Sequence, residues 1–300
     1  MHYLKLLTLL FLLIASLNSY ADWIPFEFKN NHITIEVEIN GHPVQAILDS
    51  GANINMINRS FVEKHGQNFR KTRKVRIKGV NGSSHVQLYN NIPVKMFGGE
   101  FDLDDIGVGE FGDSTLLLSS RFFSNVIVQI DFPNSRLQLF PKKSVDMDKF
   151  ENVPMKRVRS SGLPAVQVKI NGKKVWLTFD TGNSGAIYLK RSLAVNEGWL
   201  TAETKVKQAM YQGLSKIARV DQFKVNSLKI GPYELEGVSI QVPAEGENTN
   251  VGESKRETAT ANNSRISRGI KSKGDLGFGI LKHFIVTVDL DDYQLHIVAP

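Results

Sequence analysis

The sequence has no cysteine among its 300 residues, and this absence removes several classes of chemistry. A chain without thiols cannot form disulfides, thiolate zinc sites or a cysteine nucleophile. Its seven histidines include no H-E-x-x-H pair, and no G-x-S-x-G stretch marks a serine hydrolase. Hydrophobic residues make up 41% and charged residues 22%, which is typical of a globular protein with a sizeable core. We therefore expect neither a metal nor a cofactor.

Long apolar runs are also scarce. The first 21 residues, MHYLKLLTLLFLLIASLNSYA, have a basic start at Lys5, an apolar run from Leu6 to Ala15, and small residues at Ser19 and Ala21. This order is typical of a secretory signal peptide. The run is shorter than the 18 or more residues of a membrane span, so we favour cleavage after Ala21 over an uncleaved anchor helix. We expect an exported protein, periplasmic or secreted, with no stable membrane span after signal removal.

Positive charge is concentrated in RKTRKVRIK, residues 70–78, where six cations alternate with Val75 and Ile77. This alternation predicts a strand with one solvated face, which we favour over a binding patch. The formal net charge of +7 is by itself weak support for nucleic-acid binding, and we expect no nucleic acid as a partner.

A short motif occurs twice in the sequence, as AILDSGAN at residues 46–53 and as TFDTGNSG at residues 178–185. In each, an apolar strand leads to Asp, a small hydroxyl residue and Gly. One such tripeptide indicates only a turn. The two copies lie 131 residues apart (180 − 49 = 131), and the same offset carries ITIEVEINGHPVQAILDSG onto PAVQVKINGKKVWLTFDTG.

Within these matched stretches apolar and polar residues alternate, which predicts a half-buried strand in both halves. The aligned apolar positions are Ile35, Val37 and Ile39 in the first half and Val166, Val168 and Ile170 in the second. Asn40-Gly41 falls on Asn171-Gly172, and Asn-Gly between two strands predicts a tight hairpin. Helical periodicity is weak except at residues 58–65 and 190–199, where a short helix follows each motif.

A second matched pair ends each half: NVIVQIDFPNSRLQLF, residues 125–140, and HFIVTVDLDDYQLHIV, residues 283–298. Their offset is 158, so the second half carries 27 more residues (158 − 131 = 27). The polar stretch 244–273 accounts for them, and its composition predicts a disordered insertion. We therefore predict an N-terminal lobe at 22–145 and a C-terminal lobe at 146–300.

Two equivalent lobes related by a pseudo-two-fold axis would bring their equivalent loops together, with Asp49 beside Asp180. Two close carboxylates share one proton, so one can act as a base and the other as an acid. Such a pair can activate water and protonate an amide. The adjoining glycines would permit close approach and the hydroxyls would hydrogen-bond across the junction, at Ser50, Gly51, Thr181 and Gly182.

At these residues the chain resembles the retropepsin-like aspartic proteases, in a form with both lobes on one chain. The resemblance rests on residues 48–51 and 179–182, the hairpin glycines, and Leu276-Gly277. It implies an all-β fold of two homologous acid-protease lobes, with the active site at the lobe interface and Asp49 and Asp180 as the catalytic pair. It also implies a β-hairpin flap in each half, whose substrate-binding residues would be Val80, Gly82, Tyr211 and Gly213.

Some positions depart from the family pattern. The second motif has Asn183 where the first has Ala52, and the first half has Leu118-Ser119 where the second has Leu276-Gly277. The apolar-apolar-Gly element before the final strands corresponds to Asp275-Leu276-Gly277.

The resemblance implies an aspartic endopeptidase, a monomer without a cofactor, acting on a peptide or protein in extended conformation. Two other interpretations remain open. The protein could be a catalytically silent peptide-binding module that uses the same cleft. It could also be a duplicated β domain in which both Asp loops serve only as turns.

Overall fold

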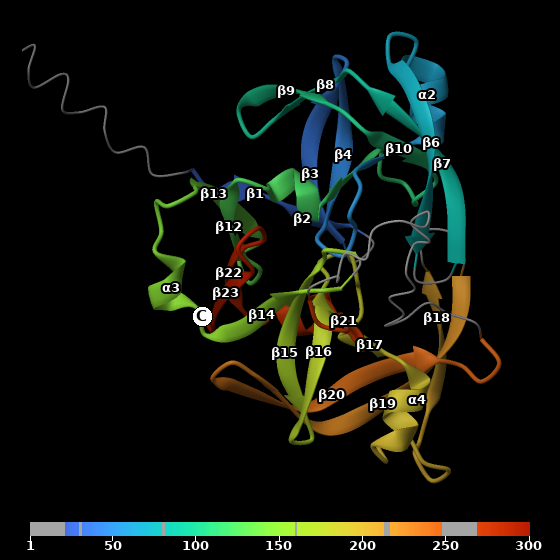
Figure 1. The fold of residues 1–300 in the computed structure, drawn as a ribbon, viewed down its shortest axis with the longest axis vertical. Helices are drawn as coiled ribbons and strands as arrows, with labels where there is room; N and C mark the ends of the chain where they lie inside the picture. The colour runs from blue at the N-terminus through green and yellow to red at the C-terminus, as the bar shows by residue number, and fades with distance from the viewer. Residues whose placement is uncertain (1–21, 30–31, 80–81, 160, 213–216, 248–268) are drawn as a thin grey trace, which may run out of the picture.

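The computed structural model describes residues 22–29, 32–79, 82–159, 161–212, 217–247 and 269–300. These residues form two lobes built almost entirely of β-strands (Figure 1). The predicted all-β, two-lobed fold is confirmed. The expected signal peptide, residues 1–21, lies outside the described residues. Within the described ranges no helix combines the length and apolar character needed to cross a membrane.

The N-lobe occupies the upper part of Figure 1 and consists of one sheet with a short helix and a 3-10 turn. Its strands are β2 (Glu27–Lys29), β3 (His32–Ile39), β4 (His42–Asp49), β5 (Met56–Asn58), β6 (Arg70–Gly79), β7 (Gly82–Asn90), β8 (Ile92–Met96), β9 (Gly99–Leu103), β10 (Ile106–Gly109) and β11 (Leu116–Ser119). Helix α2 (Arg59–His65) follows the first Asp loop where the sequence predicted one, and η1 (Ser120–Phe123) follows β11.

The C-lobe occupies the lower part of Figure 1 and repeats this order of elements with longer hairpins. Its strands are β14 (Val153–Arg157), β15 (Pro164–Ile170), β16 (Lys173–Phe179), β17 (Ile187–Leu189), β18 (Lys207–Gln212), β19 (Ile217–Ile230), β20 (Tyr233–Pro243) and β21 (Gly274–Leu276). Its helices are α3 (Met147–Phe150), α4 (Arg191–Asn196) and α5 (Phe278–Leu281), and α4 follows the second Asp loop as predicted.

The hairpins that lead to the two Asp loops form for the reasons read from the sequence. The apolar positions of β3 and β15 are buried in the core, and Glu36 and Lys169 between them are exposed. Both Asn-Gly turns have positive φ at both residues: 51° and 82° at Asn40-Gly41, 45° and 82° at Asn171-Gly172. This is the backbone of a two-residue hairpin turn whose twist matches that of its strands.

A central sheet joins the two halves of the chain. It consists of β1 (Ile24–Pro25), β12 (Val126–Asp131), β13 (Arg136–Pro141), β22 (Ile285–Asp289) and β23 (Gln294–Val298), continued by β14. Strands β12 and β22, one from each half, pair antiparallel with Gln129 opposite Thr287, and the Gln129 side chain donates a 2.8 Å hydrogen bond to the Thr287 hydroxyl. The residues at this crossing are 158 apart, which is the offset of the second matched pair, so the local two-fold axis passes between them.

The polar stretch expected as an insertion is folded at both ends. Ala244 is buried at the end of β20, and Ser272 is buried where its hydroxyl accepts the Thr178 backbone N–H. Ile270 forms a β-bridge with Val158. Residues 244–247, just after β20, and residues 269–273, just before β21, therefore belong to the folded C-lobe. Residues 248–268 lie outside the described part.

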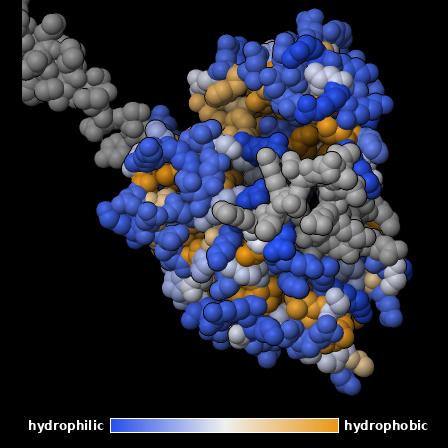
Figure 2. Space-filling view, in the orientation of Figure 1, coloured by the Kyte–Doolittle hydropathy of each residue, from blue (hydrophilic) through white to orange (hydrophobic). Residues whose placement is uncertain are grey.

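The basic segment forms β6, where Val75 and Ile77 are half-buried between exposed cations. The predicted strand with one solvated face is confirmed. Figure 2 shows a largely hydrophilic face on which apolar residues occur as separate patches. Large exposed apolar side chains in the described part include Met210 and Ile217, which lie in β18 and β19.

Candidate active site

Each Asp loop begins where a buried strand ends against a parallel partner. Strand β4 pairs in parallel with β11, with Asp49 opposite Ser119. Strand β16 pairs in parallel with β21, and the backbone N–H of Asp180 donates to the carbonyl of Leu276 at 3.0 Å. Both loops therefore leave a rigid sheet at the same point of their lobe.

The two loops adopt the same tight turn. The Gly51 backbone N–H donates to Asp49 Oδ1 at 2.9 Å, and the Gly182 N–H donates to Asp180 Oδ1 at 2.9 Å. Backbone hydrogen bonds of 3.3 Å from Ala52 to Asp49 and from Asn183 to Asp180 close the turns. One oxygen of each carboxyl group is thus fixed by its own loop.

Each carboxyl group also lies directly over the glycine of the other loop. A Cβ atom added to Gly51 would lie 2.6 Å from Asp180 Oδ2, and one added to Gly182 would lie 2.7 Å from Asp49 Oδ2. Both distances are shorter than real Cβ contacts, so a larger residue at either position would displace the carboxyl group that faces it. The side chains of Asp49 and Asp180 hydrogen-bond to each other. The loops therefore bring the two carboxyl groups face to face.

Two hydroxyl groups lock the loops across the lobe interface. The Thr181 hydroxyl accepts the Ser50 N–H at 3.0 Å and donates to the Leu48 carbonyl at 2.8 Å. The Ser50 hydroxyl accepts the Thr181 N–H at 3.0 Å and donates to the Phe179 carbonyl at 2.8 Å. This reciprocal set, called the hydroxyl lock below, holds the carboxyl groups in register.

Burial raises the pKa of the Asp180 carboxyl well above its usual range, and the negative charges of Asp49 and Asp275 raise it further. Burial also raises the pKa of Asp49, against hydrogen bonds from Gly51 and Asp180 that lower it. Both pKa values are raised because two buried carboxyl groups this close cannot both ionise cheaply, so the pair shares one proton.

A third carboxyl group, which the sequence did not single out, lies beside the pair. Asp275 of β21 stands opposite Thr178 of β16, two residues before Asp180. Burial raises its pKa, a hydrogen bond with Thr178 opposes the rise, and the charge of Asp49 adds to it, giving a pKa of about 6. Leu117 occupies the equivalent place in the N-lobe. Comparing the two halves at this position would have shown an acid where the first half has an apolar residue.

The predicted flap residues are only partly described. Val80 and Gly213 lie outside the described residues, and Gly82 begins β7 opposite Gly79. Tyr211 of β18 stacks on Tyr188 with ring centroids 4.3 Å apart. Burial raises its pKa well above the usual range, and the charges of Asp180 and Asp275 add to the rise. Tyr211 is thus close to the carboxyl groups.

The positions that depart from the family pattern have different neighbours in the two lobes. A Cβ added to Gly277 would clash with the backbone carbonyl oxygen of Asn183 and would lie 2.5 Å from that of Gly185, so the backbone of the second loop requires a glycine there. In the N-lobe the equivalent position is Ser119, whose N–H and hydroxyl both donate to Asn55 Oδ1 at 2.8 Å. Both loops keep their shape with different residues.

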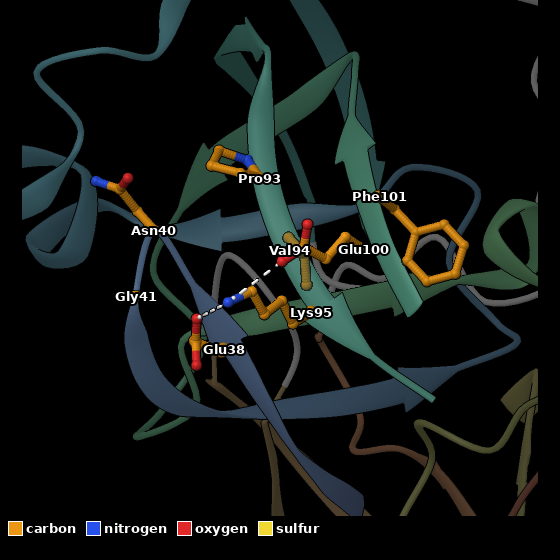
Figure 3. A pocket seen from close by; sticks show the side chains of 8 residues that line it. All are labelled: Glu38, Asn40, Gly41, Pro93, Val94, Lys95, Glu100 and Phe101. Carbon is orange, nitrogen blue, oxygen red and sulfur yellow. Dashed lines mark ion pairs between the residues drawn. The ribbon is translucent and has the colours of Figure 1, made fainter. Parts of the chain in front are cut away.

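A separate hollow of about 250 Å³ lies in the N-lobe at the far end of the β3–β4 hairpin from Asp49 (Figure 3). Lys95 forms ion pairs there with Glu38 and Glu100, at 3.1 and 3.2 Å. Among the described residues no cluster of His, Asp or Glu is arranged to hold a metal ion. The carboxyl pair at the lobe interface is the candidate active site because the two loops hold its acids against each other.

The chain was compared with protein families, curated proteins and solved structures. A family model described as aspartyl protease matches residues 35–106 and 166–254, which together make up more than half of the chain. A solved structure of the simian foamy virus (mac) protease matches at 23% identity, covering 30% of this chain and 90% of that one, with a TM-score of 0.24. None of the curated proteins compared with the chain matches it. Because the family match covers more than half of the chain and spans both Asp loops, the chain belongs to the aspartyl protease family, with both loops in one polypeptide.

Proposed function

We propose that this protein is an aspartic endopeptidase that hydrolyses peptide bonds with Asp49 and Asp180. The observation that supports this most directly is the reciprocal seating of each carboxyl group over the glycine of the other loop. This seating fixes two carboxyl groups at hydrogen-bonding distance from each other in a buried site, where they share one proton.

In the proposed reaction the ionised Asp49 takes a proton from a water molecule as the water oxygen attacks the peptide carbonyl carbon. The protonated Asp180 donates its proton to the carbonyl oxygen, which gives a neutral tetrahedral diol. The proton on Asp49 then passes to the peptide nitrogen, a diol proton returns to Asp180, and the C–N bond breaks. Each proton thus moves between groups that the loops already hold in place.

Asp131 and Asp289 provide matched controls, because they are buried aspartates in the central sheet. Asp131 accepts hydrogen bonds from Asn134 and Arg136. Asp289 accepts one from Lys142 at 2.7 Å and also holds the backbone of the β22–β23 turn. Their carboxyl groups have structural partners already, so replacing them with Asn should lower stability without removing the chemistry.

The test is hydrolysis of a mixed peptide library by protein lacking residues 1–21, from pH 3 to 8. Asp49→Asn and Asp180→Asn should each lower the cleavage rate by roughly 10²–10⁴-fold, the usual contribution of acid–base groups, with thermal unfolding close to that of the unaltered protein. Asp289→Asn should still cleave. If either active-site variant cuts as fast as the unaltered protein, the pair is not catalytic. If the unaltered protein binds peptides but cuts none, it is a peptide-binding module.

Export of the protein to the periplasm or medium is part of the same proposal, supported by the order of charge, apolar run and small residues in residues 1–21. N-terminal sequencing of the protein from the cell envelope or medium should find Asp22 as the first residue. A chain that retains Met1 would contradict cleavage.

A further inference from the structure

The two sides of the carboxyl pair present chemically different surfaces. In a β-strand, residues two apart point to the same face, so Ile47 shares the face of Asp49 and Thr178 shares the face of Asp180. In each lobe the side chains on this face of the neighbouring strands lie beside the carboxyl group, and they are called the wall of that lobe below.

The N-lobe wall is largely apolar, with Thr34 of β3 as a polar residue opposite Ile47. Leu117 of β11 stands opposite Ile47 on one side and Met56 of β5 on the other. These side chains belong to one buried cluster separate from the main core, formed by Ile47, Met56, Val86, Leu88, Phe111 and Leu117.

The C-lobe wall has polar groups at the same places. Asp275 of β21 stands opposite Thr178 on one side and Tyr188 of β17 on the other. Its neighbour Leu276 lies in the main core, so the Asp275 side chain is on the opposite face, with Thr178 and Asp180. The stacked rings of Tyr188 and Tyr211 continue this wall.

Asp275 has a hydroxyl partner and no cationic one. Within the described part of the chain no ion pair involves Asp275, and the groups that shift its pKa, Thr178 and Asp49, are not cations. Burying a carboxylate without a cation is costly, so a positive charge brought beside Asp275 would be bound favourably.

We propose that Asp275 makes the C-lobe side of the cleft selective for a lysine or arginine side chain, while the N-lobe side takes an apolar one. An extended peptide points successive side chains in opposite directions, so the residues on either side of the cleaved bond face opposite lobes. The preferred site of cleavage thus joins one apolar residue to one cationic residue. This inference rests on the proposed endopeptidase activity.

The test compares peptides that differ at one residue next to the cleaved bond, with Lys, Arg, Met or Leu at that position. For the purified protein, kcat/KM should be about 10- to 100-fold higher for Lys or Arg than for Met on one side of the bond, the range expected for a charge-assisted hydrogen bond. On the other side Leu or Met should be preferred. Equal rates for Lys and Met on both sides would overturn the proposal.

Two variants assign the preference to Asp275. In Asp275→Asn and Asp275→Leu, the ratio of kcat/KM for the Lys and Arg peptides to kcat/KM for the Met peptides should fall by about 10- to 100-fold, whatever the loss of this charge does to the Asp49–Asp180 pair. Asp102→Asn, at an exposed position of β9, controls for the loss of one negative charge. An equal fall for all peptides would overturn the proposal, because Asp275 would then act on the carboxyl pair or the fold.

A binding measurement separates this inference from the proposed function. Peptide affinity of Asp180→Asn, measured by fluorescence anisotropy, should keep the preference for Lys over Met even where cleavage is lost. If the unaltered protein cleaves apolar peptides and shows no preference for a cation, the endopeptidase stands and the role of Asp275 falls. If Asp180→Asn binds Lys peptides preferentially while the unaltered protein cuts nothing, the selectivity stands and the endopeptidase falls.

Discussion

The hydroxyl lock gives a prediction whose size follows from its hydrogen bonds. Thr181→Val replaces the hydroxyl with a methyl group of similar size, so it removes the acceptor of the Ser50 N–H and the donor to the Leu48 carbonyl. Both are buried backbone groups, and leaving one unsatisfied costs about 1–3 kcal/mol. We therefore expect Thr181→Val to lower the free energy of unfolding by roughly 2–6 kcal/mol. Thr181→Ser keeps the hydroxyl and should cost far less.

The reciprocal bonds make Ser50→Ala a second measurement of the same junction. It removes the partners of the Thr181 N–H and the Phe179 carbonyl, so its cost should be similar to that of Thr181→Val. Denaturant unfolding of both single variants and the double variant gives the coupling between them. We expect the double variant to lose less than the sum, because releasing either loop frees the other. A cost below about 0.5 kcal/mol for Thr181→Val, the scale of an ordinary surface change, would refute this account.

Two further predictions concern the carboxyl groups. Gly182→Ala would place a methyl group against the Asp49 carboxyl, and displacing that group by about 1 Å should lower peptide cleavage by roughly 100-fold, which kinetics on a folded variant would check. Asp275 has a pKa raised from 3.8 to about 6, so the folded state holds this proton more tightly than the unfolded state does. Stability should therefore fall as the pH rises from about 4 to about 6, by up to about 3 kcal/mol from this group, and Asp275→Asn should flatten that part of the curve of unfolding free energy against pH. An unchanged slope in the variant would contradict it.

Much of the fold could be predicted because its local signals agree with the tertiary structure. The alternation in β3 and β15 was visible because one face of each strand is buried and the other is solvated. The Asn-Gly turns were visible because few residues adopt positive φ twice in succession. The Asp loops were visible because close approach demands glycine at a fixed spacing.

The rest depends on contacts between distant segments, which leave weaker traces. The matched stretches at 125–140 and 283–298 indicated equivalent strands, but their pairing into one central sheet has no local signal. The ends of the polar insertion are anchored by single contacts such as that of Ser272 with Thr178. Asp275 was interpreted only as one position of an apolar-apolar-Gly element, although it is an acid. Its place beside the carboxyl pair follows from the pairing of β21 with β16 and β17, which the sequence does not show.

The placement of both Asp loops on one polypeptide has a consequence for how such a cleft can change. A cleft built from two identical chains must carry every substitution twice, once on each side of its axis. Here the codons for Leu117 and Asp275 are separate, as are those for Ala52 and Asn183, so a mutation can alter one wall and leave its counterpart untouched. Because the two lobes are joined in one polypeptide, the two walls can differ and can favour one orientation of a bound peptide over the other. Two identical subunits related by a two-fold axis cannot make this distinction by themselves.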